Sequence, residues 1–174
     1  MSTFELIAES IVYVLPAYAA NGAPVVVVRM VGQPHPLDLG RSWHGRRLLG
    51  DGKTAEGLAS GLAAGILAAL SIALISPSTY RGFEEAFLLV VGAITGDLAG
   101  SFVKRRLGYP RGKSAPVLDQ LGFIIVALVA ASIPYGPSGW ITPITLAAIL
   151  LLTAILHLGT NALAYLLKIK DRWY

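Results

Sequence analysis

Five apolar stretches separated by polar loops account for most of the chain. A helix crosses a bilayer with roughly 20 mostly apolar residues, and three stretches meet this length: 54–75, 83–103 and 142–167. Residues 4–28 are also long enough, but Asn21, Gly22 and Pro24 interrupt them, so we expect a broken helix. Residues 120–133 suffice only if residues 116–119 supply a first turn, where proline is well tolerated. The pattern predicts an all-α membrane protein with five transmembrane helices in a single domain over residues 1–174.

The composition supports a membrane protein and excludes other classes. Hydrophobic residues make up 55% and charged residues 14% of the chain, and the mean hydropathy is +0.65, which is unlike a soluble domain. The absence of cysteine excludes disulfides and thiolate metal sites. The basic balance does not indicate nucleic acid, because membrane proteins gather Lys and Arg on cytoplasmic loops. The start "MSTFELIAES" lacks the basic segment of a signal peptide, so we expect the first stretch to be retained.

The distribution of basic residues predicts the orientation. From the first loop to the C-terminal tail, the segments between stretches carry five, one, five, zero and three Lys or Arg residues. Such alternation is typical of a protein whose basic loops face the cytoplasm. We therefore predict a cell-membrane protein with an outer N-terminus, two large cytoplasmic loops and a cytoplasmic C-terminal tail.

The third stretch ends in "GDLAGSFVKRR", where Asp97 stands alone among apolar residues. An acid inside a membrane segment is costly and usually faces a wet cavity or a partner. Polar residues follow it at helical spacing, and glycines flank it: Ser101, Lys104, Gly96 and Gly100. The glycines would let backbone, ligand or metal come close. Alternatively, Asp97 forms a helix-end ion pair with Lys104 or Arg105, and the glycines serve only helix packing.

A second acid, Asp119, lies across the next basic loop at the start of the fourth stretch. Two carboxylates suit Mg²⁺, which takes few protein ligands when substrate phosphates complete its shell. Basic side chains of this region would hold those phosphates: Lys104, Arg105, Arg106 and Arg111. Attraction to anionic lipid would also explain the basic residues, but it would not explain the two acids.

The segment "RRLLGDGKTAEG" leads into the second stretch. Its glycine-rich turn would expose backbone N–H groups to a phosphate at a helix N-terminus, and a lysine adds charge. The residues concerned are Gly50, Asp51, Gly52, Lys53 and Thr54. The segment is not a P-loop, because Arg47 stands where that motif needs glycine. The alternative is an ordinary N-cap with Glu56 in the first turn.

Other polar residues in the apolar stretches are weaker candidates. His157 and Asn161 share one face of the last stretch and are typical of inter-helical hydrogen bonds. Asn21 lies in the interrupted first stretch, and unwound backbone at membrane depth is tolerated where it lines a cavity. Glu84 and Glu85 begin the third stretch and are interpreted as charges at a helix N-terminus.

Four segments together carry a family resemblance: "NGAP", "RRLLGDGKTAEG", "GDLAGSFVKRRLGYPRGKSAPVLDQLGF" and "HLGTNALAY". In them, over nearly its full length, the chain resembles the CDP-archaeol synthases, archaeal CTP:2,3-di-O-geranylgeranyl-sn-glycerol-1-phosphate cytidylyltransferases that look like compact relatives of bacterial CDP-diacylglycerol synthases. One departure stands out. The usual pattern reads Leu-Asp-Gln-Leu-Asp-Phe, and here Gly122 replaces the second acid.

The resemblance implies that the phosphate of an isoprenoid ether lipid attacks the α-phosphorus of CTP and releases pyrophosphate. It implies that Asp97 and Asp119 hold Mg²⁺, that Lys104 is catalytic, and that the basic and glycine-rich residues, with Gly100 and Ser101, bind the substrates. Asn21, His157 and Asn161 would line the cavity. The alternative is a small transporter or a membrane scaffold. A permeation path needs polar residues in the outer half, whereas this chain places them at the predicted cytoplasmic ends.

Overall fold

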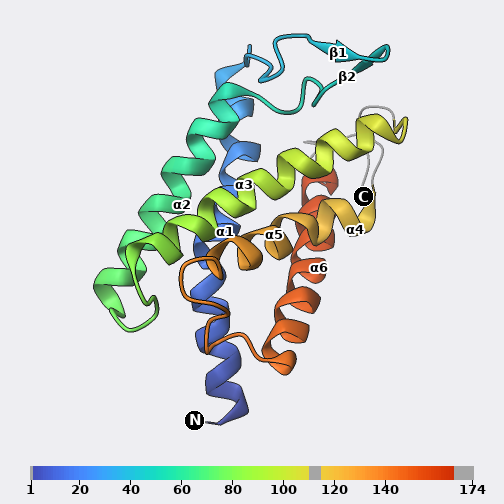
Figure 1. The fold of residues 1–174 in the computed structure, drawn as a ribbon. Helices are drawn as coiled ribbons and strands as arrows, with labels where there is room; N and C mark the ends of the chain where they lie inside the picture. Colours follow the sequence, from blue (N-terminus) through green and yellow to red (C-terminus); the bar gives the residue numbers. More distant parts are fainter. Residues whose placement is uncertain (1, 110–114, 167–174) are drawn as a thin grey trace.

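The computed structural model describes residues 2–109 and 115–166 and is mainly helical. Its elements are α1 (Thr3–Val31), β1 (Ser42–Trp43), β2 (Arg46–Arg47), α2 (Ala55–Ile75), α3 (Phe83–Arg106), α4 (Pro116–Gln120), α5 (Gly122–Ala131) and α6 (Pro143–Leu166) (Figure 1). The two strands form one short antiparallel hairpin with Ser42 opposite Arg47. The predicted all-α membrane class is confirmed.

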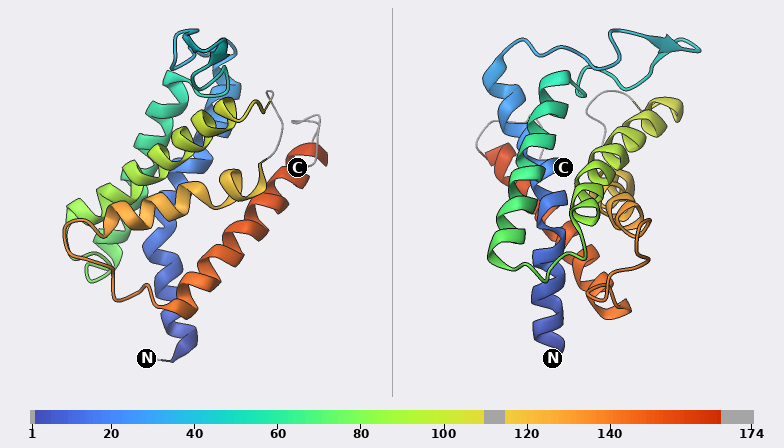
Figure 2. Two further views of the ribbon diagram at one scale, coloured as in Figure 1. Left: turned by 45° about the vertical axis from the view of Figure 1, so that its right-hand side comes forward. Right: turned by 60° about the vertical axis from the view of Figure 1, so that its left-hand side comes forward.

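Four segments in the described part of the chain are long and apolar enough to cross a membrane: Thr3–Val31, Ala55–Ile75, Phe83–Arg106 and Pro143–Thr160. The fourth predicted stretch is instead two helices, α4 and the shorter apolar α5, joined at Leu121. Pro116 begins α4, so the expected first turn is present. In the views of Figure 2, α4 and α5 continue in one direction alongside α3.

The expected break in the first helix is absent: α1 runs continuously through Asn21, Gly22 and Pro24. A proline removes one helical hydrogen bond, but the ring of Pro24 also packs into α2. A Cβ added at Gly61 would lie 3.4 Å from Cγ of Pro24, and one added at Gly57 would lie 3.5 Å from its Cβ. This packing is a tertiary contact that compensates for the lost bond, and local sequence does not reveal it.

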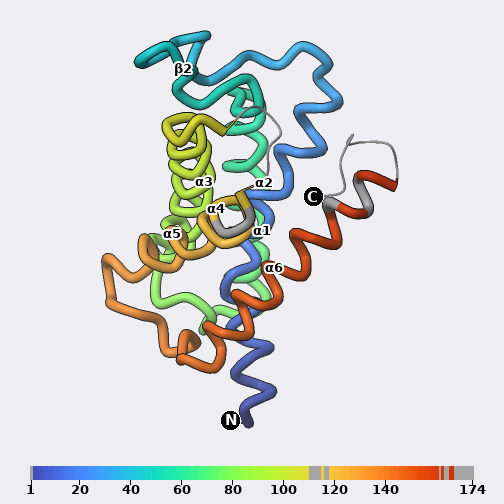
Figure 3. Tube along the Cα trace, turned by 90° about the vertical axis from the view of Figure 1, so that its right-hand side faces the viewer, coloured from blue at the N-terminus to red at the C-terminus, as the bar shows by residue number. Residues whose placement is uncertain are grey.

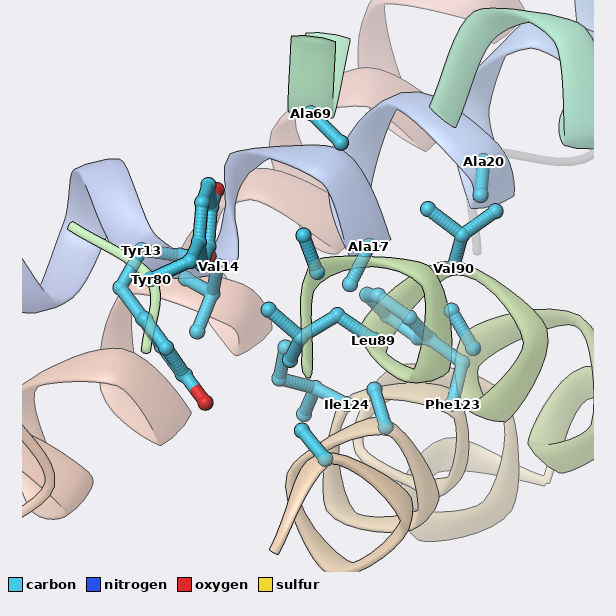
Figure 4. Close-up of a cluster of buried hydrophobic side chains, with 14 of the residues drawn as sticks. Tyr13, Val14, Ala17, Ala20, Ala69, Tyr80, Leu89, Val90, Phe123 and Ile124 are labelled. Carbon is cyan, nitrogen blue, oxygen red and sulfur yellow. The ribbon is translucent and has the colours of Figure 1, made fainter. Parts of the chain in front are cut away.

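Glycines set the closest helix contacts. A Cβ at Gly61 of α2 would lie 2.6 Å from the backbone oxygen of Ala20 in α1, and one at Gly92 of α3 would lie 2.7 Å from Cα of Ala127 in α5. Small residues allow such approach where lipid provides no hydrophobic drive between helices. Larger side chains from α1, α3 and α5 fill the space between these contacts, including Tyr13, Leu89 and Ile124 (Figure 4).

The two ends of the bundle have different chemistry. Residues 32–54, with the β1–β2 hairpin, lie at the same end as the last turn of α3, and we call this the hairpin end (Figures 1 and 3). The N-terminus lies at the opposite end with residues 76–82 and 132–142. The two predicted cytoplasmic loops therefore begin at one end of the molecule.

An ion pair with a buried carboxylate connects the helices and loops at the N-terminal end. Glu85 is fully buried and pairs with Arg81, and its Oε1 also accepts a hydrogen bond from the Tyr13 hydroxyl at 2.8 Å. Arg81 in turn donates to the backbone oxygens of Tyr135 at 2.9 Å and Gly136 at 2.7 Å. Glu85 does lie in the first turn of α3, as the sequence interpretation expected, but its carboxylate also bonds to Tyr13 of α1 and, through Arg81, connects both loops of this end.

Candidate active site

Two lysine–aspartate pairs lie toward the hairpin end. Nζ of Lys53, just before α2, donates to Oδ2 of Asp97 in α3 at 2.6 Å. Lys104, near the end of α3, pairs with Asp119 of α4. Oδ2 of Asp119 also accepts the N–H of Ala115 at 2.9 Å. The expected alternative, in which Asp97 pairs with Lys104 or Arg105 along its own helix, is not what the structure shows.

The glycines beside Asp97 allow α3 to lie close to α4, which carries Asp119, and to α5. A Cβ at Gly96 would lie 2.8 Å from the backbone oxygen of Gly122, and one at Gly100 would lie 3.5 Å from that of Leu118. Gly100 of α3 therefore faces the residue before Asp119, and Gly96 faces the start of α5. Gly122, where the family pattern has its second acid, lies against the residue before Asp97.

Asp38, a buried aspartate that is part of no motif in the sequence, holds the first loop together by hydrogen bonds. Asp38 is 6% exposed and accepts the N–H groups of Gly40, Leu49 and Gly50 as well as two bonds from the Arg47 guanidinium. The hydrogen bonds from Arg47, followed by those from the backbone, hold the pKa of this carboxyl well below its usual range. Arg47 also reaches Asp51 at 2.7 Å. The only sequence signal for Asp38 is that it is one of two acids in an arginine-rich loop, the other being Asp51.

The glycine-rich turn after this loop contains both a cap and a left-handed residue. Oγ1 of Thr54 accepts the N–H of Gly57 at 3.0 Å, which makes Thr54 the N-cap of α2, as the alternative interpretation expected. Gly50 has φ +87° and faces Arg105, since a Cβ there would lie 3.9 Å from its Cδ. Asp51 and Gly52 complete the turn that carries Lys53 to Asp97.

The two arginines at the end of α3 have different surroundings. The Nε of Arg105 is buried and has no hydrogen-bond partner in the described part of the chain. Arg106 instead donates to backbone oxygens of the hairpin, including those of Trp43 at 2.7 Å and Arg47 at 2.6 Å. Its terminal nitrogens are thus engaged by the protein itself, although its Nε, like that of Arg105, is buried without a hydrogen-bond partner among the described residues.

The remaining candidates lie on α1, α3 and α6, and one of them lies outside the described residues. Asn21 is half-buried in α1 and His157 is half-buried in α6. Asn161 belongs to α6, Gly100 and the buried Ser101 to α3. Arg111 lies outside the described residues.

The two carboxylates of this region would suit Mg²⁺ only if substrate phosphates and water supplied the other ligands. Within residues 2–109 and 115–166, no group of three or more His, Asp or Glu side chains is placed to hold a metal. Asp97 and Asp119 carry carboxylate oxygens, which are hard ligands, on the packed helices α3 and α4, and Oδ1 of Asp97 accepts no hydrogen bond from the described residues. This suits an ion whose shell is completed by phosphates and water, which Mg²⁺ prefers to an all-protein cage.

Comparison with known proteins identifies the family. The family model of CarS-like CDP-archaeol synthases matches residues 3–174. CDP-archaeol synthase of Aeropyrum pernix is 47% identical over 94% of this chain and 90% of its own length. That of Pyrococcus furiosus is 42% identical over 95% and 96%, respectively. A solved intramembrane enzyme for archaeal membrane lipids biosynthesis superposes with a TM-score of 0.77 at 45% identity, covering 89% of this chain and 94% of that one. The chain therefore belongs to the CDP-archaeol synthase family.

Proposed function

We propose that this protein transfers the CMP moiety of CTP to the phosphate of 2,3-bis-O-geranylgeranyl-sn-glycerol 1-phosphate. The products are CDP-archaeol and pyrophosphate. The observation that carries the proposal is the full-length family match, which includes each motif of the site. The relatives are synthases, so the transporter and scaffold alternatives have no support among them.

An oxygen of the lipid phosphate attacks the α-phosphorus, the bond from that phosphorus to the bridging oxygen breaks, and pyrophosphate leaves with the electron pair. Such transfers need mainly in-line positioning and neutralisation of charge. Asp97 and Asp119 would hold Mg²⁺, which when bound neutralises phosphate charge and orients the oxygens. Lys53 and Lys104 then turn from the carboxylates to phosphate oxygens, with Lys104 as the catalytic cation. Arg105 and the turn of residues 50–54 bind the remaining phosphate charge, but the N–H groups of Gly50 and Lys53 take no part, because they donate to Asp38 and to the Gly50 oxygen.

We also propose a topology that is compatible with this function. Five crossings, with α4 and α5 as the fourth, give an outer N-terminus and place the hairpin end in the cytoplasm, where CTP is available. Residues 1–174 would act as one membrane-embedded catalytic domain of the cell membrane. The lipid chains would remain among the helices, while the lipid phosphate meets the nucleotide near Asp97 and Asp119. Asn21, His157 and Asn161 would line this cavity.

Purified protein supplied with labelled CTP, Mg²⁺ and the archaeal lipid phosphate tests the proposal directly. We expect pyrophosphate release that requires the lipid, and its absence would refute the function. Asp97→Asn and Asp119→Asn should each lower kcat/KM by roughly 100-fold or more, the scale on which removal of one charge-stabilising group acts. Glu84→Gln, an exposed acid at the opposite end, is the matched control. Full activity in folded Asp97 and Asp119 variants would refute the metal assignment while leaving the function standing.

Partner loss must be separated from metal loss in the Asp97 variant. Asp97→Asn also deprives Lys53 of its ion pair. If Asp97 served only to hold Lys53, Lys53→Gln would reproduce the defect, and the Mg²⁺ dependence of activity would not change. We expect Asp97→Asn, but not Lys53→Gln, to raise the half-saturating Mg²⁺ concentration.

A further inference from the structure

A small arginine-lined pocket opens at the hairpin end. Its volume is about 230 Å³, and it is lined by Arg46, Arg47, Arg105, Gly108 and Tyr109. Sites that enclose a whole small ligand usually measure roughly 300–1,000 Å³. The pocket therefore suits part of a ligand, such as one or two phosphate groups, better than an entire nucleotide.

The arginines of this pocket are not equally satisfied. Arg47 is neutralised by Asp38 and Asp51. Arg105 forms no ion pair with any described residue, and its Nε is buried without a hydrogen-bond partner. A buried donor without a partner is costly, and a guanidinium matches two phosphate oxygens at once. The unmatched positive charge of Arg105 therefore points to an anionic occupant, and the exposed Arg46 adds a second guanidinium to the pocket lining.

Arg46 lines the pocket while the hairpin packs against α3, where Trp43 stacks on Phe102 and Arg106 bonds to the hairpin backbone. Nη1 of Arg106 donates to the oxygen of Trp43 at 2.7 Å, and Nη2 donates to those of Arg46 at 2.9 Å and Arg47 at 2.6 Å. Its guanidinium lies 5.4 Å from the ring centre of Trp43 and 5.3 Å from that of Phe102. Nη1 of Arg46 returns a bond to the Arg106 oxygen. Three carbonyls and two rings fit a planar fork and not an ammonium.

We propose that Arg106 is a positioning residue, which docks the 42–47 hairpin on α3 and so completes a pocket for the pyrophosphate portion of the nucleotide. Arg46 and Arg105 bind this portion directly, and Arg106 acts through the hairpin. The inference rests on the proposed function and adds a division of labour. The lysine–aspartate pairs serve the transferred phosphate and the lipid phosphate, whereas the arginine pocket holds the leaving group.

The test is pyrophosphate binding measured by calorimetry on the full chain in micelles. We expect Arg105→Gln and Arg46→Gln each to weaken binding by about 10-fold or more, the effect of losing one hydrogen bond between charged groups. Arg106→Lys should weaken it nearly as much as Arg106→Gln, although the charge is kept. Trp43→Leu, which removes the ring beside Arg106 together with its stacking on Phe102, should shift affinity in the same direction. Arg41→Gln, an exposed arginine of the same loop, is the control for net charge.

Kinetics separate positioning from general damage to the fold. Arg106→Lys should raise KM for CTP, while kcat, KM for the lipid and the thermal unfolding midpoint change little. If Arg106→Lys retains wild-type pyrophosphate affinity, Arg106 is a direct charge contact and the positioning role is refuted. If sn-glycerol 1-phosphate, and not pyrophosphate, loses affinity in Arg105→Gln, the pocket belongs to the lipid phosphate and the proposal is overturned. Lipid-dependent pyrophosphate release by the wild type tests the proposed function separately.

Discussion

Replacing Glu85 by Gln removes the central charge of the network at the N-terminal end. The carboxylate accepts the Tyr13 hydroxyl, the backbone N–H of Arg81 at 2.8 Å, and the guanidinium of Arg81. Glutamine keeps one acceptor oxygen but turns an NH₂ group toward these donors. The substitution therefore leaves the fully buried position with unmatched donors and the Arg81 cation without its partner.

The expected cost follows from the burial of each partner. Breaking a buried ion pair costs about 3–5 kcal/mol. Glu85 is completely buried, but the Arg81 side chain is 36% exposed and can regain water, so we take the lower end, about 3 kcal/mol. For a chain of this size, roughly 2–4 °C is lost per kcal/mol, which gives a decrease in Tm of about 6–12 °C.

Thermal unfolding in detergent micelles measures this decrease. Tryptophan emission is a suitable signal, because Nε1 of Trp140 donates to the oxygen of Thr79 at the same end. Glu84→Gln is the matched control: it alters the neighbouring exposed acid, so Tm should change by less than about 2 °C, as surface substitutions do. A similarly small change in Glu85→Gln would refute the view that this network fastens the bundle. Because the carboxylate pairs lie toward the other end, kcat well below Tm should be nearly unchanged.

Four further changes test the first loop, the helix contacts and the metal site. Asp38→Asn should lower Tm at pH 7, and because the folded pKa of Asp38 is depressed, the difference from wild type should shrink as pH falls below the ordinary value of about 3.9. A pH-independent difference would contradict this reasoning. Gly96→Ala would place its Cβ 2.8 Å from the Gly122 oxygen and should cost about 1–3 kcal/mol in unfolding measurements. Gly22→Ala, with nothing within 4 Å, should instead be neutral or stabilising. Gly122→Asp has room, since its Cβ would lie 4.0 Å from the Gly96 oxygen, and a carboxylate so close to Asp97 should lower the half-saturating Mg²⁺ concentration of activity.

Sequence patterns predicted the positions of the long helices, which depend on composition and spacing. They did not predict the features that depend on contacts between distant residues. Hydropathy located every long helix, because the bilayer sets the required length. It failed at α1, since the ring of Pro24 packs against glycines of α2 that are distant in sequence. The partner of Asp97 was also missed. Helical spacing suggested Lys104, but the turn before α2 delivers Lys53. The i, i+4 spacing of Arg81 and Glu85 was a usable signal, but sequence gives no sign that the pair is buried.

Burial separates the acid that fastens this bundle from the acid that is free to exchange partners. Glu85 is completely buried and surrounded by donors, so any other partner would first have to break its ion pair with Arg81, which costs about 3 kcal/mol. Asp97 is 39% exposed, its Lys53 partner is 24% exposed, and one carboxylate oxygen accepts nothing from the described residues. A partly exposed pair contributes only about 0–1 kcal/mol. A cation with bound phosphates can displace Lys53 at little cost, and the freed ammonium then has phosphate oxygens to bind. The Arg81–Glu85 pair therefore stabilises the bundle at the N-terminal end, whereas the Lys53–Asp97 pair toward the hairpin end can exchange partners.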